Sequence, residues 1–164
     1  MKRAFLIGWI LICVSTSVFA WLGATEKQCE ARYGKPEPAQ TPDLGSDKTI
    51  RYRKAGAFVT ANFIKGKCVR IQYGLNEVLQ QEHIDTFFNL NGGTSVWSHV
   101  KGGTGDEYVR SDGRGKAVVS PGLNGHVTFF YDEWQKAHDQ AIKDREEAAN
   151  AVEKERLKKF SREF

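Results

Sequence analysis

Apolar and polar residues alternate in two separate parts of this chain, and each part follows a segment with a helical pattern. The first part contains "TIRYRKAG", "AFVTANFIKGK" and "CVRIQY", with a tight turn at Gly66. The second contains "SVWSHV", "EYVRSDGRGKAVVS" and "HVTFFYDEW", with turns at Asp112-Gly113 and Asn124-Gly125. A period of two is typical of antiparallel strands with one wet face. We therefore expect an antiparallel sheet made from two groups of three strands.

A short helix is expected over about residues 26–33. Thr25 can cap it, Gln28 completes a capping-box pattern, and Gly34 followed by Pro36 ends it.

A second helix is expected within "NEVLQQEHIDTFFNLNGG", where apolar residues recur at helical spacing and Asn91-Gly92-Gly93 ends the pattern. The order helix, three strands, helix, three strands predicts an α+β fold with helices packed on the sheet. The two halves end alike, in "GKCVRIQY" and "NGHVTFFY", so a degenerate internal duplication stays open.

Residues 1–20 have the order of a secretory signal peptide: Lys2 and Arg3, an apolar run to about Cys13, then Ala20 before the cut. The apolar run is shorter than the ~20 residues of a membrane span. We expect cleavage, loss of Cys13 and an exported protein, periplasmic or secreted, without a membrane span. A retained anchor is the alternative.

Removal of the signal leaves Cys29 and Cys68, about 40 residues apart. Two thiols in an oxidising compartment usually pair, so the sequence predicts a Cys29–Cys68 disulfide worth about 3–4 kcal/mol. A metal or redox pair is disfavoured because C-x-x-C spacing is absent and no histidine is close in sequence.

Residues 132–164 form a charged segment without Gly or Pro, with nine acidic and eight basic residues. It predicts a helical extension beyond a domain at 21–131. Arg145 and Arg156 interrupt its apolar positions, which disfavours a regular coiled coil. A solvated helix, a partner-docking helix and a self-associating helix all stay open.

The net charge of the chain and the motifs it lacks limit the classes of function to be considered. Without the signal the chain has 22 Lys and Arg against 20 Asp and Glu, too small an excess to indicate nucleic acid as a partner. H-E-x-x-H, G-x-x-x-x-G-K-[ST] and G-x-S-x-G are all absent, so no catalytic, metal or cofactor site is predicted. The sequence favours a protein that is not an enzyme.

A candidate binding surface lies around the glycine-rich loop "KGGTGDEYVRSDGRGK", because such loops often carry contacts in small domains. Aromatic residues crowd the junction with the last helix, where Phe129 and Phe130 point to opposite faces of one strand. The candidate residues are Trp97, Lys101, Asp106, Glu107, Tyr108 and Trp134.

The "CEARYGKPE" helix stop and the repeated helix-then-strands order resemble the SmpA/OmlA-like lipoproteins and the β-lactamase inhibitory proteins over residues 24–131. The resemblance implies an antiparallel envelope domain that binds proteins. This chain departs from the pattern because it lacks a lipid-attachment cysteine after the signal and carries the charged extension.

The leading hypothesis is an exported, non-enzymatic binding or scaffold protein that contacts another protein. One alternative is a small hydrolase that pairs His99 with Asp106 or Glu107. The other is a salt-sensitive binder of an anionic envelope polymer, which would use four basic residues. These are Arg53, Lys65, Lys67 and Arg70.

Overall fold

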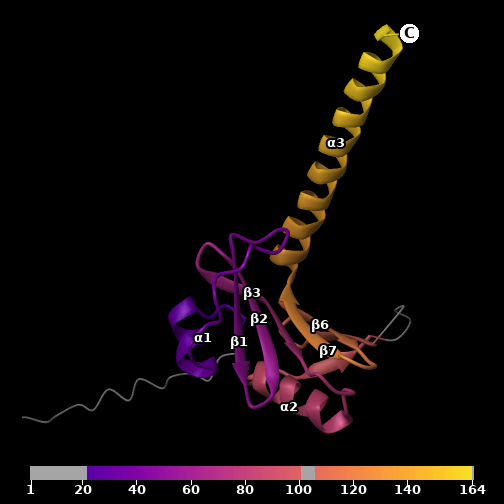
Figure 1. Cartoon of the computed structure of the whole chain (residues 1–164). Coiled ribbons are helices and arrows are strands. Elements are labelled where there is room, and N and C mark those ends of the chain that lie inside the picture. Colours follow the sequence, from indigo (N-terminus) through magenta and orange to yellow (C-terminus); the bar gives the residue numbers. More distant parts are fainter. Residues whose placement is uncertain (1–21, 101–105, 164) are drawn as a thin grey trace, which may run out of the picture.

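Residues 22–100 and 106–163 are described by the structure, a computed structural model (Figure 1). The predicted signal peptide and Lys101 lie outside these residues. The described chain has three helices and one seven-stranded antiparallel sheet, which confirms the α+β fold. The strand order is β1-β2-β3-β7-β6-β5-β4.

The first half of the chain forms α1 (Glu26–Tyr33), β1 (Lys48–Lys54), β2 (Ala57–Ile64) and β3 (Lys67–Gly74). The predicted capping box on α1 is present, with Thr25 and Gln28 bonded to each other's backbone. Both hairpin turns, Ala55-Gly56 and Lys65-Gly66, have positive φ at their two central residues. That geometry suits two-residue hairpins because its twist matches that of the strands.

The second half forms α2 (Gln81–Gly92), β4 (Trp97–His99), β5 (Asp106–Arg110), β6 (Gly115–Ser120) and β7 (His126–Tyr131). It therefore has four strands, and the expectation of three was wrong. The stretch "EYVRSDGRGKAVVS" is a hairpin rather than one strand, since the Gly113 N–H donates to the Arg110 carbonyl at 2.8 Å. The turn was recognisable from its Asp-Gly pair.

The two halves meet where β3 pairs with β7 at the centre of the sheet. One core cluster contains Tyr33 of α1, Phe87 of α2 and Phe129 of β7, so both short helices cover the same face. Phe130 points to the opposite face, where it packs with Val69 and Trp134. Helix α3 (Asp132–Glu163) starts from this second cluster and runs away from the sheet (Figure 1).

Candidate functional site

The two cysteines come together but stay as thiols, so the predicted disulfide is not present in the structure. Both are fully buried, and their side chains are in hydrogen-bond contact. The Cys68 Sγ also donates to the Arg70 carbonyl at 3.3 Å. Sequence separation and compartment indicate which thiols can meet, whereas a bond also requires a narrow side-chain geometry. The hydrogen bond with Cys29 and burial raise the pKa of Cys68 well above its usual range, which makes it a poor nucleophile.

The candidate binding residues that the structure describes lie on both faces of the sheet. Trp97 packs against Phe129 and Phe88 with ring centroids 5.2 and 5.6 Å apart, on the face that α1 and α2 cover. Trp134 belongs to the cluster on the opposite face.

The strand residues of that surface divide further. Tyr108 is half-buried against Phe88, with ring centroids 4.6 Å apart. Asp106 is exposed at the start of β5, and the neighbouring Glu107 is half-buried. The aromatic members therefore serve mainly as packing groups.

The acid–histidine pair proposed for a hydrolase is only partly assembled. His99 Nε2 lies 3.6 Å from the Asp106 carboxylate, beyond ordinary hydrogen-bond reach, and both side chains are about half exposed. Neither residue lines the cavities beside α1, β1 or β4. Both side chains of this pair are therefore open to solvent.

The four basic residues proposed for polymer binding lie at two ends of the sheet. Arg53 lies near the β1–β2 turn, 3.4 Å from the Glu37 carboxylate, whereas Lys65 lies in the β2–β3 turn and Lys67 directly follows it. Arg70 is largely buried and donates to Asn62 and Gln72 side chains. These cations do not line up as a single patch.

The base of α3 is fixed to the sheet by a stack of three side chains. The Trp134 ring contacts the Arg70 guanidinium, 4.9 Å from the ring centroid, and the His138 ring, with centroids 4.8 Å apart. The loop at Gly45 comes so close that an added Cβ would sit 2.5 Å from the His138 backbone nitrogen. The first turns of α3 are therefore part of the folded core.

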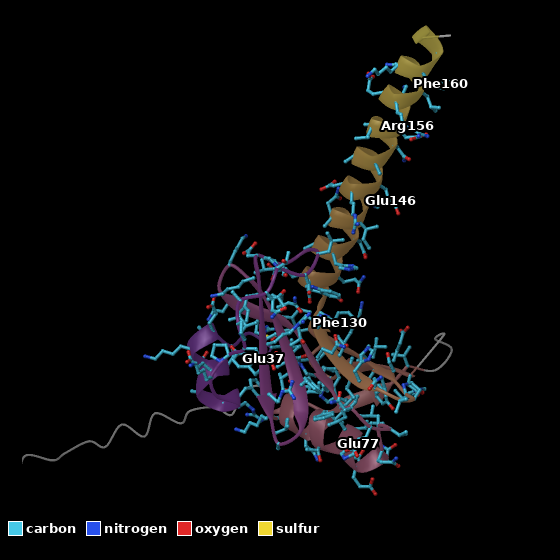
Figure 2. The ribbon with its side chains drawn as sticks, in the orientation of Figure 1. Glu37, Glu77, Phe130, Glu146, Arg156 and Phe160 are labelled. Carbon is cyan, nitrogen blue, oxygen red and sulfur yellow. The ribbon has the colours of Figure 1, made fainter. Side chains whose placement is uncertain are left out.

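Beyond this base, α3 has no cover from the described chain. Every residue from Ile142 to Ser161 is exposed, including Val152 at 71% and Phe160 at 61%. Figure 2 shows Glu146, Arg156 and Phe160 along this projecting part. Five apolar side chains lie on one side of it, within an arc of about 140° that also holds Arg145 and Arg156. This α3 stripe consists of Ile142, Ala149, Val152, Leu157 and Phe160.

A cavity of about 790 Å³ lies between α1, α2 and the ends of β1, β2 and β3. Its lining is mainly apolar, with Tyr33, Tyr73 and Phe87 among the buried residues. Sequence reasoning missed this site, because its residues come from separate elements and share no motif.

The buried hydroxyl groups beside this cavity are paired. Tyr33 and Tyr73 share a hydrogen bond of 2.6 Å, and Asn91 Nδ2 donates to the Tyr73 hydroxyl at 3.1 Å. Burial raises the pKa of Tyr73 to about 12 and raises the pKa of Tyr33 as well. Both hydroxyls are thus neutral at physiological pH and cannot act as tyrosinate bases.

The chain matches no known family model, no curated protein and no solved structure. Within residues 22–100 and 106–163, no group of three or more His, Cys, Asp or Glu side chains could hold a metal ion. Among the helices that the structure describes, none is both long and apolar enough to cross a membrane.

Proposed function

We propose that this chain is an exported, non-enzymatic scaffold protein that acts through protein–protein contact made by helix α3. The observation that carries the proposal is the exposure of every residue from Ile142 to Ser161 on a helix whose base is packed into the core. A projecting helix of about 33 Å presents a long surface at a defined angle. Isolated helices are only marginally stable in water, so a partner that covers the stripe would stabilise this one.

Charge order along α3 favours a partner helix that runs antiparallel. Residues 142–153 hold four acidic and two basic residues, and residues 154–163 hold two acidic and five basic. The helix dipole favours the same order, but its effect is confined to the first and last turns. The charge asymmetry extends over the whole projecting part of α3, so the helix dipole does not account for all of it.

A second copy of this chain has the required charge order. In an antiparallel pair, the acidic part of each α3 lies along the basic part of the other, while the stripe residues meet between them. A parallel pair would place like charges side by side. The two cores would lie at opposite ends of the paired helices, clear of each other.

Sedimentation velocity over a range of concentrations tests this pairing. We expect dimers that weaken at high salt, because the charges are exposed. Ala149→Asp introduces a charge into the stripe and should give monomers. Ala151→Asp is the matched control: it makes the same replacement in the same helix, but two residues away and so on the opposite face, and should still give dimers.

Equal behaviour of the two variants would refute the stripe as the contact surface. A wild-type chain that is monomeric at every concentration would exclude a second copy as the partner. A protein that the wild-type and Ala151→Asp chains capture from envelope extract, but the Ala149→Asp chain does not, would then be a different partner that uses the same surface.

A further inference from the structure

The cavity between α1 and α2 has the size and walls of a small-molecule site. Its volume of about 790 Å³ falls within the ~300–1,000 Å³ of typical ligand pockets. Val59 and Tyr73 line it from the sheet, Tyr33 from α1, and Phe87 and Leu90 from α2. Such walls favour an apolar body, since burial of apolar surface is the main source of its affinity.

The polar groups beside these walls bond mainly to one another. The Tyr33 and Tyr73 hydroxyls are bonded to each other, and the Tyr73 hydroxyl also accepts from Asn91. A hydrocarbon group laid over the two hydroxyls would leave the hydrogen bond between them in place. The inner part of the cavity thus accepts an apolar chain.

The rim of the cavity is charged, and its charge differs from end to end. Arg32 lies over the Tyr33 ring, 5.7 Å from the centroid, and the Lys54 ammonium donates to the Arg32 carbonyl. At the other end Glu77 lies 3.9 Å from the His83 imidazole, and Figure 2 shows Glu77 beside α2. The end formed by α1 and β1 is therefore the cationic one.

We propose that this cavity binds a small amphiphile whose apolar body occupies the walls of α2 and the sheet and whose acidic head group lies beside Arg32 and Lys54. The inference goes beyond the proposed function of α3, because none of the cavity residues belongs to that helix. An Ala149→Asp chain should accordingly bind the amphiphile as the wild-type chain does. Failure of one proposal leaves the other standing.

Three probes with alkyl chains of equal length distinguish the contribution of the head group to affinity from that of the alkyl chain. Isothermal titration calorimetry with decanoate, 1-decanol and decylammonium, the charged probes below their micelle concentrations and decanol below its solubility limit, should give the affinity order decanoate, decanol, decylammonium. Lys54→Glu should weaken decanoate binding by about fivefold, the size of one exposed charge pair, and leave decanol unchanged. Lys67→Glu is the matched control at the far end of the sheet and should change neither.

A second pair of variants tests where the alkyl chain of the probe binds. Leu90→Asp places a charge in the cavity wall and should abolish binding of all three probes. Leu123→Asp, on the β6–β7 loop, should leave binding intact. Far-ultraviolet circular dichroism confirms that each variant is folded.

Three results would overturn the proposal. Decylammonium binding as tightly as decanoate would exclude the cationic rim as the head-group site. Unchanged binding by a folded Leu90→Asp chain would place the ligand elsewhere. Absence of heat with all three probes, up to their solubility limits and at two well-separated temperatures, would show that the cavity takes no amphiphile, because burial of apolar surface makes the heat of binding depend on temperature.

Discussion

Two shortened chains test whether the folded core ends inside α3 rather than before it. A chain that ends after Ala141 loses the part of α3 in which residues 142–161 are all exposed, so its free energy of unfolding should stay within about 0.5 kcal/mol of the full chain. A chain that ends after Tyr131 also loses Trp134, which is 9% exposed. Removing a buried tryptophan side chain costs about 3–5 kcal/mol, and here Phe130 and Val69 would be uncovered as well.

Urea denaturation followed by circular dichroism measures the three unfolding free energies. We expect a loss of about 4 kcal/mol for the chain that ends after Tyr131, a large part of the 5–15 kcal/mol of a typical domain. Trp134→Ala in the full chain should cost about 3 kcal/mol, and its exposed counterpart Phe160→Ala less than about 0.5. A loss above 1 kcal/mol on ending the chain after Ala141 would refute the reasoning, as would an unchanged chain ending after Tyr131.

Three further outcomes are expected. Burial raises the pKa of Tyr73 to about 12, above the value near 10 of an exposed tyrosine, so the stability it contributes is complete below pH ~10 and is lost as pH rises toward ~12. Tyr73→Phe should reduce the slope of that part of a stability–pH curve without removing it, because the pKa of Tyr33 is raised as well. The thiols of Cys29 and Cys68 should resist alkylation in the native protein and both react in urea, and rapid native labelling would contradict their burial. Gly45→Ala should destabilise by at least about 1–2 kcal/mol in thermal melts, because φ is +81° and the new Cβ meets the His138 backbone; an unchanged melting temperature would contradict that contact.

The features that sequence predicted well depend on neighbouring residues. Thr25 and Gln28 are three positions apart, so their capping box needs no distant contact. The Gly66 turn and the alternation of the strands are equally local. The missed hairpin at Asp112-Gly113 shows the limit: its turn was recognised, yet the residues on both sides were taken as one strand.

The features that sequence did not predict depend on how distant segments pack. The cavity takes Tyr33 from α1, Val59 from β2 and Leu90 from α2, and no spacing in the chain connects them. The strand period placed Phe129 and Phe130 on opposite faces correctly. It left open whether α3 or a partner covers Phe130, and the structure shows Trp134 there.

The central position of β3 and β7 bears on the order in which the molecule can fold. One edge of β3 pairs with β2 through a tight hairpin. The other edge pairs with β7, where Arg70 is opposite Phe130, 60 positions later in the chain. A ribosome must therefore release nearly the whole domain before that edge is covered. Pairing over such a distance is slow, and an uncovered strand edge invites intermolecular association. The closing of this one ladder should set both the folding rate and the interval in which newly made chains are prone to aggregate.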